Sequence, residues 1–289
     1  MNQDLISARY DISQRVGQGG QGSVYLARSK QTGQEVALKI FNITPSNRDM
    51  VFQEAKALSA VSYPNCNPYI ACYHNSFYDP TTNQAVIEME YVRGPTVSAY
   101  TQPLRNQGNR PLLILCSKLL LKAALHGLQY IHSHNILHND IKPSNIVVGP
   151  NKVPVIVDFG ISCFVHDAIN SACTQQYNKV IGNCCNTMAG TSIYIPPEAT
   201  KNVRYPSSDL WSLAATVYEI MSGSNIWGLN VGQYNAYSLM KEVVNKINQQ
   251  VPPNKLSSGD QTLDMVVNSF LNYDPASRMS IDQALSVLG

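Results

Sequence analysis

The stretch ILHNDIKPSNIVVGPNKVPVIVDFG, residues 136–160, decides the fold of this chain. Two short runs rich in β-branched residues, 145–148 and 153–158, flank the turn signal Gly-Pro-Asn-Lys at 149–152. Such runs on either side of a turn signal predict an antiparallel β-hairpin. Because the two arms are nearly equal in length, the first residue of one arm and the last residue of the other are expected to meet at the open end.

Those two end residues are Asn145 and Asp158, and Asp140 and Lys142 lie just upstream of the same end. The hairpin therefore gathers two carboxylates, an amide oxygen and an ammonium group. Hard oxygen ligands of this kind suit Mg²⁺, which takes one or two protein oxygens and completes its coordination with phosphate and water. The sequence predicts a magnesium site at this point.

The same stretch resembles the catalytic loop and metal-binding segment of eukaryotic-type protein kinases, His-Arg-Asp-x-x-x-x-Asn followed by Asp-Phe-Gly. The resemblance implies that Asp140 accepts the proton of the substrate hydroxyl and that Lys142 neutralises the transferring phosphoryl group. It also implies that Asn145 and Asp158 hold Mg²⁺ or Mn²⁺ beside ATP. One position departs from the pattern, because Asn139 stands where the family usually has Arg.

A glycine-rich turn, GQGGQGSV at 17–24, lies between two strand-like runs. Such a turn is more often only a turn, although its glycines let the backbone approach a phosphate closely. Here a valine follows two residues after the last glycine, as in the kinase loop, whereas P-loop and Rossmann turns open a helix. The resemblance implies that this loop binds the nucleotide, through Val16, Gly17, Gly19, Gly20, Gly22 and Val24.

The strand predicted at 35–41 places Ala37 and Lys39 on one face and larger apolar side chains on the other. If the apolar face lies in the core of its lobe, Ala37 and Lys39 face the cleft. The strand resembles the kinase Val-Ala-Ile-Lys strand, which implies that Lys39 binds the α- and β-phosphates.

Helix start signals and an apolar stripe after this strand predict a helix that ends near Ala60. Glu54 lies beside the stripe and is the candidate partner of Lys39, in competition with Glu35 and Glu88. We prefer Glu54 because it alone lies on a helix after the lysine strand. An exposed ion pair contributes only ~0–1 kcal/mol, so we expect the pair to orient Lys39 rather than to stabilise the fold.

Two further strand-like runs, 69–78 and 84–90, lead into the sequence Met-Glu-Tyr-Val at 89–92. The resemblance implies that this is the hinge that binds adenine, largely through main-chain groups. A strand that runs into a loop accounts for these residues almost as well. The adenine site implied by the resemblance comprises Met89, Glu90, Val92 and, on the first arm of the hairpin, Val147.

The C-terminal half begins with a helix predicted at 112–133, which is apolar on nearly all sides and therefore buried. It leads to His138, which we expect to be a packed structural histidine, because the neighbouring carboxylate Asp140 already fills the role of base. Further helical patterns follow, at 209–222, 233–248, 261–271 and 280–288.

The segment that ends in Gly-Thr191-Ser-Ile-Tyr-Ile-Pro-Pro-Glu198 resembles the activation-segment ending of serine/threonine kinases. Thr191, together with Lys142, implies a Ser or Thr acceptor. The resemblance also implies that Arg278 pairs with Glu198 and that Asp209 steadies the catalytic loop.

Seven cysteines, an odd number without a Cys-x-x-Cys pair, argue against a disulfide framework or a structural zinc site. A reducing, cytoplasmic location is expected, since the first residues also lack the pattern of a signal peptide. Five residues of the activation segment could form a metal site or a redox switch: Cys163, His166, Cys173, Cys184 and Cys185. Their spacing fits no template of metal ligands. Ordinary thiols are therefore the preferred interpretation of these cysteines.

The composition fits one enzyme domain without an extreme charge. Charged residues make up 14% of the chain, against about 25% in ordinary domains, and the formal net charge is +2. Neither nucleic acid nor an anionic membrane is therefore expected as a partner. The most apolar run, 111–128, is interrupted by Lys and His and falls short of the roughly 20 apolar residues that span a bilayer, so no membrane span is expected.

The resemblance implies a two-lobed α+β fold, with a tail at 1–9, an N-terminal lobe at 10–92 and a C-terminal lobe at 93–289. It implies a protein serine/threonine kinase that uses Mg·ATP. A pseudokinase scaffold is the alternative, although such proteins usually lack the strand lysine or a metal-binding acid. A small-molecule kinase shares the Asp/Asn/Asp core but would not need the peptide platform.

Asn139 generates a hypothesis about control. Arg at this position pairs with a phosphorylated activation loop, and the neutral Asn cannot do so. We expect activity that does not depend on phosphorylation of the loop, or control by a regulatory protein partner.

Overall fold

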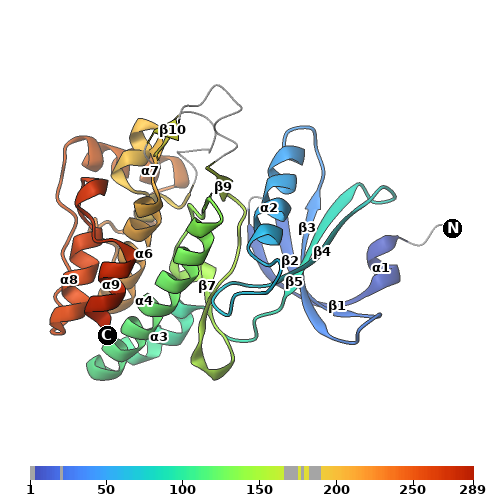
Figure 1. Ribbon diagram of the computed structural model, residues 1–289, viewed down its shortest axis with the longest axis horizontal. Helices are drawn as coiled ribbons and strands as arrows, with labels where there is room; N and C mark the ends of the chain where they lie inside the picture. The colour runs from blue at the N-terminus through green and yellow to red at the C-terminus, as the bar shows by residue number, and fades with distance from the viewer. Residues whose placement is uncertain (1–3, 20–21, 166–174, 177–178, 182–189) are drawn as a thin grey trace.

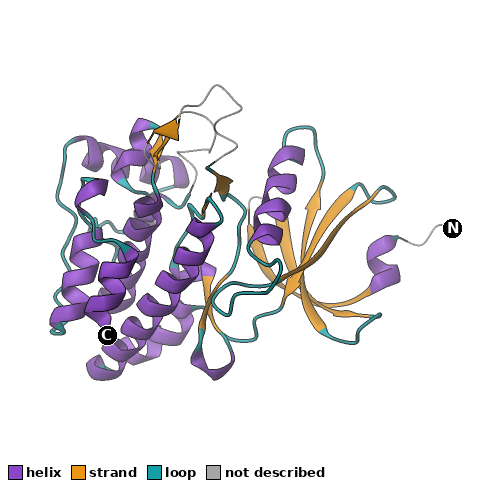
Figure 2. Ribbon diagram, viewed as in Figure 1, coloured by secondary structure: helices purple, strands orange, loops and turns teal. Residues whose placement is uncertain are grey.

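The computed structural model describes residues 4–19, 22–165, 175–176, 179–181 and 190–289. The chain forms a β-rich N-terminal lobe and a mainly helical C-terminal lobe, which confirms the predicted two-lobed α+β fold (Figures 1 and 2). The N-terminal lobe contains an antiparallel sheet in the order β1-β2-β3-β5-β4. Its strands are β1 (Tyr10–Gly19), β2 (Gly22–Ser29), β3 (Glu35–Asn42), β4 (Tyr73–Asp79) and β5 (Gln84–Glu90).

The strand β3 separates two apolar layers. Val36 and Leu38 are buried on one face, in a cluster with Ile6 of helix α1 (Leu5–Arg9). Ala37 belongs to the main core on the other face, where helix α2 (Arg48–Ala60) packs. The expected tail at 1–9 therefore contains a helix, which forms because Asp4 caps it and its one buried side chain covers the sheet.

Six helices build most of the C-terminal lobe in the described part of the chain. They are α3 (Val97–Asn106), α4 (Arg110–Ser133), α6 (Pro206–Ser222), α7 (Ala236–Asn248), α8 (Gln261–Phe270) and α9 (Ile281–Leu288). Short strand pairs accompany them: β6 (Ile136–Leu137) with β9 (Cys163–Phe164), β7 (Ile146–Val148) with β8 (Pro154–Ile156), and β10 (Gln175–Gln176) with β11 (Lys179–Ile181) and β12 (Val203–Arg204).

Helix α4 lies at the centre of this lobe. By length and composition alone it could cross a membrane, contrary to the expectation from its interrupted apolar run, but half of its most apolar window is buried inside the protein. It packs on α6, α3 and α9 and on β8. These contacts support its interpretation as the buried core helix that the sequence predicts.

A buried ion pair fastens the end of the activation segment to the C-terminal lobe. Arg278 donates to both carboxylate oxygens of Glu198, at 2.7 and 2.8 Å, and the guanidinium also lies over the ring of Trp211. The Arg278 side chain is 0% exposed. The Glu198–Arg278 pair expected from the resemblance is therefore present and is desolvated.

One expectation about cysteines is wrong. Cys66 and Cys72 are joined in a disulfide within the loop between α2 and β4. The loop turns back on itself and brings two cysteines that are six positions apart to a Cα–Cα distance of 5.4 Å, which their spacing alone does not reveal. Cys163, for which an ordinary thiol was the preferred interpretation, is disulfide-bonded as well. His166, Cys173, Cys184 and Cys185 lie outside the described residues.

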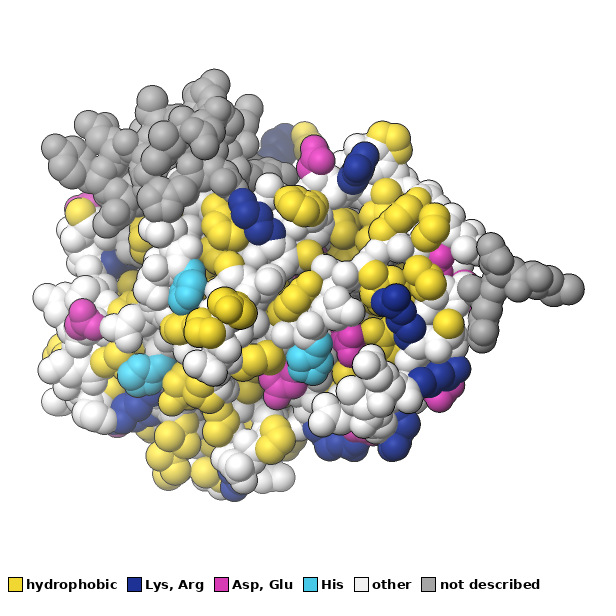
Figure 3. All heavy atoms as spheres, turned by 45° about the vertical axis from the view of Figure 1, so that its right-hand side comes forward, with side chains coloured by type: hydrophobic (Ala, Val, Ile, Leu, Met, Phe, Trp, Pro, Cys, Tyr) yellow, Lys and Arg dark blue, Asp and Glu magenta, His cyan; other side chains and the backbone are white. Residues whose placement is uncertain are grey.

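On the face shown in Figure 3, Lys, Arg, Asp and Glu side chains are interspersed among many neutral and apolar ones. This agrees with the low charged fraction of the sequence.

We expect Arg278→Met to lower the free energy of unfolding by about 3–5 kcal/mol, because it leaves the Glu198 carboxylate buried without its cation. Urea denaturation followed by tryptophan fluorescence measures this loss. Lys30→Met, which removes the partner of the exposed Asp11, is the matched control and should change stability by less than about 1 kcal/mol. Equal losses in the two variants would contradict this account.

Candidate active site

A buried lysine connects the two lobes. The Lys39 ammonium group on β3 lies 2.5 Å from Glu54 Oε1 on α2 and 2.7 Å from Asp158 Oδ1 beyond β8. The Lys39 and Glu54 side chains are 6% and 1% exposed. Glu54 is thus the partner of Lys39, but the pair is buried rather than exposed, so the small contribution expected for a surface pair does not apply.

The competing acids are engaged elsewhere. Glu35 forms an ion pair with Arg93, and Glu88 accepts a hydrogen bond of 2.6 Å from the hydroxyl of Tyr10. Glu88 cannot reach Lys39 because it lies on the opposite face of the sheet, with Leu38 as its cross-strand partner. Only the acid on α2 is presented to the lysine.

Burial and charge act in opposite directions on this triad. Burial by itself would lower the pKa of Lys39, but Glu54 and Asp158 outweigh it and hold that pKa above its usual value. Burial raises the pKa of Glu54 to about 7 against the influence of Lys39. Burial would also raise the pKa of Asp158, yet the charge and hydrogen bond of Lys39 lower it overall. Lys39 is therefore a cation and Asp158 an anion near neutral pH.

The catalytic loop carries a second polar cluster. Lys142 Nζ lies 2.6 Å from Asp140 Oδ2 and 2.9 Å from the Thr191 hydroxyl oxygen. The Thr191 hydroxyl donates to Asp140 Oδ1 at 3.3 Å, and the Asn145 amide donates to Asp140 Oδ2 at 2.9 Å. The carboxylate predicted to be the base is therefore held by three side chains.

The predicted hairpin is confirmed, with β7 and β8 paired antiparallel. Its open end is closed by a backbone hydrogen bond of 2.9 Å from the Val157 amide to the Asn145 carbonyl. This bond places Asn145 beside the residue that precedes Asp158. The two residues assigned to the metal thus come from the two arms of one hairpin.

The donor set of the hairpin end fits a hard cation. Asn145 uses its amide nitrogen to donate to Asp140, so its Oδ1 atom remains available to accept. Asp158 uses Oδ1 for Lys39 and for the Gly160 amide, and its Oδ2 atom has no hydrogen-bond partner within the described ranges. One amide oxygen and one carboxylate oxygen are the ligands that Mg²⁺ takes together with phosphate.

A buried aspartate on α6 holds the catalytic loop, as the resemblance implies. Asp209 accepts from the backbone amides of His138 and Asn139 at 3.0 and 2.8 Å, and its carboxylate lies 2.8 Å from His132 Nε2. His138 is 0% exposed and its ring packs edge-on against Phe159. Burial lowers the pKa of His138, so the ring is neutral, which agrees with a packed structural histidine.

The residues assigned to adenine occupy neighbouring strands. Ala37 and Met89 are cross-strand partners on β3 and β5, and both are buried. Val92, just beyond β5, packs with Val147 of β7 in a small apolar cluster. The structure thus brings side chains of both lobes together at the base of the N-terminal sheet, although it does not test which of them contact a nucleotide.

The glycine-rich turn joins β1 and β2, with Gly19 paired with Gly22 at its end. A Cβ atom on Gly22 would lie 3.0 Å from the Ile40 carbonyl oxygen and the Phe41 ring, so a larger residue does not fit there. Val24 pairs with Lys39 across β2 and β3, and Val16 is 42% exposed. Gly17 follows Val16 on β1, whereas Gly20 lies outside the described residues.

Asn139, which the sequence singled out, donates through its amide to the Ile161 carbonyl at 3.2 Å and to Cys163 Sγ at 3.3 Å. Sequence reasoning missed two other contributors to the site. His132 orients Asp209, and Glu219 accepts from the Tyr194 hydroxyl at 2.6 Å. A single histidine or glutamate on a helix carries no pattern, so nothing in the sequence singled these residues out.

Comparison with known proteins agrees with this geometry. A profile of the protein kinase domain matches residues 10–287. The chain belongs to the protein kinase domain family. The match covers both lobes, the Lys39–Glu54–Asp158 triad and the catalytic loop, so this protein kinase domain is identified over nearly its whole length.

Curated relatives are protein kinases of several kinds. Mitogen-activated protein kinase kinase 2 of Arabidopsis thaliana is 29% identical over 282 residues, which cover 95% of this chain and 70% of the relative. The tobacco (Nicotiana tabacum) mitogen-activated protein kinase kinase SIPKK is 30% identical over 261 residues, 88% of this chain and 66% of the relative. Human serine/threonine-protein kinase Nek11 is 27% identical over 296 residues, 98% of this chain and 40% of the relative. The chain thus spans between two fifths and about two thirds of the length of most of these relatives.

We expect Asp209→Asn to destabilise the kinase domain by about 1.5–3 kcal/mol at neutral pH, because an amide group replaces one oxygen that accepts from the catalytic-loop backbone. Burial alone would raise the pKa of Asp209, but its bonds to His132 and His138 lower it overall. The contribution of the Asp209 carboxylate to the stability of the fold is therefore present above the pKa of about 3.9 that this group has in the unfolded chain. The contribution is lost as the pH falls through the lower pKa of the same group in the folded protein.

Urea denaturation at several pH values measures the gap in stability between the parent and Asp209→Asn. The gap should be constant from about pH 7 to pH 5 and should narrow below about pH 4. A gap that widens in acid would contradict the assignment of an ionised Asp209.

Proposed function

We propose that this chain is an active protein serine/threonine kinase that transfers the γ-phosphoryl group of ATP to a protein hydroxyl. The observation that carries the proposal is one set of charged contacts drawn from both lobes. Lys39 contacts Glu54 and Asp158, and the hairpin that ends in Asp158 begins at Asn145, which contacts Asp140. These side chains are of the kinds that phosphoryl transfer uses for positioning and charge stabilisation.

We propose roles for the catalytic loop that the resemblance implies and that its contacts support. Asp140 would accept the proton of the attacking hydroxyl as the oxygen bonds to phosphorus. Lys142 contacts this carboxylate directly and would carry the positive charge that the transferring phosphoryl group needs. Thr191 ties Lys142 to the activation segment, so an ordered segment and an aligned base are linked.

Lys39 is proposed to exchange part of its contact with Asp158 for the α- and β-phosphates, while Glu54 keeps it oriented. Asn145 Oδ1 and Asp158 Oδ2 would hold Mg²⁺ or Mn²⁺. When bound, the metal supplies neutralising charge at the phosphate oxygens. Once Lys39 no longer contacts Asp158 Oδ1, this oxygen would also be available to the cation.

A Ser or Thr acceptor is supported by two observations. Lys142 and Thr191 are in direct contact, and this pair is the one that the resemblance to serine/threonine kinases implies. The relative Nek11 is a serine/threonine-protein kinase by name. The mitogen-activated protein kinase kinases among the relatives suggest another protein kinase as one class of substrate to test.

We expect Asp158→Ala and Lys39→Ala each to reduce turnover at least about a hundredfold, because each removes a preorganised stabilising group worth ~2.7–4 kcal/mol in the transition state. Incubation with labelled ATP and a cell lysate, followed by mass spectrometry, measures transfer and identifies the acceptor residues. Lys201→Ala, at an exposed position of the C-terminal lobe, is the control.

Thermal unfolding of each variant shows whether the fold is retained. Unchanged turnover in Asp158→Ala would refute the assigned roles. A parent protein whose melting temperature rises with Mg·ATP but which transfers no phosphate would instead favour the alternative, a pseudokinase scaffold.

We also propose that activity does not depend on phosphorylation of the activation segment. Asn139 adopts a left-handed backbone conformation, with φ of 68°, and its amide donates to the Ile161 carbonyl. Its own carbonyl lies close to Gly190 at the other end of the segment, 3.2 Å from where a Cβ atom would be. Asn139 thus makes neutral contacts with both ends of the segment. An Arg at this position would need a phosphate group on the segment to make a comparable contact.

We expect phosphatase treatment to leave the kcat/KM of the parent within about twofold. Asn139→Gly, which keeps the left-handed conformation and removes the amide, should lower kcat/KM about two- to tenfold, because it removes a neutral hydrogen bond of about 0.5–1.5 kcal/mol. Steady-state phosphorylation of a substrate peptide measures both effects. Loss of activity after phosphatase treatment would overturn this proposal.

A further inference from the structure

The loop between α2 and β4 contains a disulfide that phosphoryl transfer does not use. Cys66 is exposed, and Cys72 is half-buried just before β4. Their Cα atoms are 5.4 Å apart, a separation that is usual for bonded cysteines. Because an exposed disulfide can be attacked by thiols from solution, it is reduced more readily than a buried one.

The segment between the two cysteines, residues 67–71, is bound to the C-terminal lobe. The Ala71 amide donates to the Ile156 carbonyl on β8 at 2.9 Å, and the Ile156 amide donates to the Tyr69 carbonyl at 2.8 Å. The Tyr69 ring also stacks on the ring of His126 on α4, with the ring centres 5.6 Å apart. The loop is therefore attached to both the hairpin and the central helix of that lobe.

The second cysteine and its neighbours are bound to the N-terminal lobe. The Glu90 amide, at the end of β5, donates to the Cys72 carbonyl at 2.7 Å, and the Cys72 amide donates to the Glu90 carboxylate at 3.2 Å. The Tyr73 amide donates to the Ser62 hydroxyl oxygen, and that hydroxyl donates to the Leu58 carbonyl on α2. The disulfide thus closes a loop that joins α2, the end of β5 and the C-terminal lobe.

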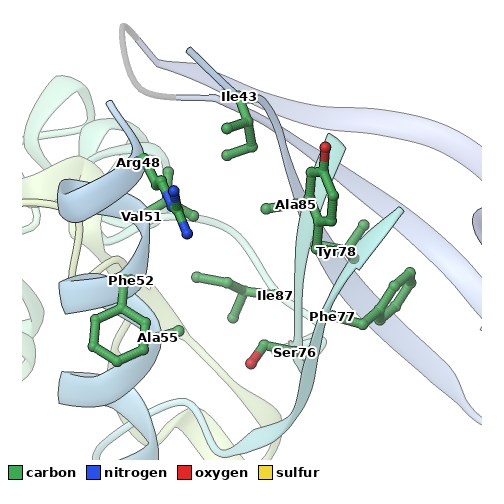
Figure 4. A pocket seen from close by; sticks show the side chains of 11 residues that line it. Ile43, Arg48, Val51, Phe52, Ala55, Ser76, Phe77, Tyr78, Ala85 and Ile87 are labelled. Carbon is green, nitrogen blue, oxygen red and sulfur yellow. The ribbon is translucent and has the colours of Figure 1, made fainter. Parts of the chain in front are cut away.

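Helix α2 depends on this loop for the position of its C-terminal end. An apolar groove of about 530 Å³ lies between α2 and strands β4 and β5, so the helix is only partly packed against the sheet on that side (Figure 4). Leu58, which accepts the hydrogen bond from Ser62, lies one helical turn after Glu54, the partner of Lys39. A restraint on the loop is therefore also a restraint on the helix that presents Glu54.

We propose that Cys66 and Cys72 form a site of reversible oxidation by a peroxide. The exposed Cys66 thiolate attacks one oxygen of hydrogen peroxide, the O–O bond breaks, and a sulfenic acid forms. The departing hydroxide takes up the proton that Cys66 lost and becomes water. The Cys72 thiol then attacks the sulfenic sulfur, the disulfide forms and a second water leaves, so the pair has given two electrons to the peroxide. A dithiol reverses the oxidation by exchange and itself becomes a disulfide.

The loop connects this oxidation to the active site. The oxidised form is the one in which Glu54 contacts Lys39 and Cys72 is bound to Glu90. Reduction removes the covalent link across the loop, which loosens the attachment of α2 and of β5 to the C-terminal lobe. Oxidation therefore raises kinase activity, and this consequence, unlike the oxidation itself, rests on the proposed kinase function.

Peptide mapping tests the oxidation. Trypsin cuts after Lys56 and Arg93, and the peptide 57–93 contains Cys66 and Cys72 and no other cysteine. The native full chain is treated with hydrogen peroxide or with dithiothreitol, alkylated with iodoacetamide and digested. After peroxide, the peptide should have lost the mass of two hydrogen atoms and should carry no alkyl group. After dithiothreitol, both of its cysteines should be alkylated.

Two results of this mapping would overturn the proposal. In one, peroxide leaves both cysteines of the peptide open to alkylation, or adds oxygen to them without forming the disulfide. In the other, the disulfide resists dithiothreitol until the protein is unfolded in urea, as a purely structural bond would. Cys116→Ser, which removes a free thiol on α4, is the control and should leave the response of the peptide unchanged.

Hydrogen exchange tests the coupling to α2 without any measurement of activity. Reduction should speed the exchange of the amides from Leu58 to Tyr73 at least about twofold, because it loosens the loop that restrains them. Cys66→Ser should exchange like the reduced parent after either treatment. Amides of helix α8 are the internal control. Equal exchange in the oxidised and the reduced parent would refute the coupling.

The activity arm separates this proposal from the proposed kinase function. Reduction should lower the kcat/KM of the parent for ATP at least about threefold, and Cys66→Ser should have the lower value before reduction and should not fall further. Because Cys163 is also disulfide-bonded, a Cys66→Ser variant that responds to reduction as the parent does would refute the coupling through this loop. A chain that transfers no phosphate in either state would refute the kinase function, while the peptide mapping would still decide the oxidation.

Discussion

The structure depends on one buried cation. Lys39 has lost almost all contact with solvent, and its charge is balanced by Glu54 from α2 and Asp158 from the C-terminal lobe. Because a buried charge without a partner is costly, any arrangement that keeps Lys39 in place must also keep the helix and the hairpin end near it. The same electrostatic requirement therefore links the positions of the two lobes and of the Asp158 carboxylate.

The two lobes satisfy their polar requirements in different ways. In the C-terminal lobe, the buried Asp209 accepts hydrogen bonds from the backbone of the catalytic loop and so restrains that loop. The Glu198–Arg278 pair is also buried, and Arg278 contacts both carboxylate oxygens of Glu198. In the N-terminal lobe, α2 contacts the sheet beside an open apolar groove.

A neutral residue stands at a position where the family usually has a charged one. Asn139 donates to the Ile161 carbonyl, and its own carbonyl lies near Gly190. These are the contacts on which the proposed independence from phosphorylation of the activation segment rests. Neutral hydrogen bonds depend less on ionic strength than exposed ion pairs do.

The sequence by itself determined the two-lobed fold, the hairpin with Asn145 and Asp158 at its ends, and Glu54 as the partner of Lys39, because local periodicity, turn residues and a family motif encode them. Only the tertiary structure decided that the Lys39 pair is buried, that Cys66 and Cys72 are bonded, that residues 5–9 form a packed helix, and that His132 orients Asp209. The physical reason is that burial and side-chain partners depend on residues far apart in the chain: Lys39 and Asp158 are separated by 119 positions, and no local pattern records their contact.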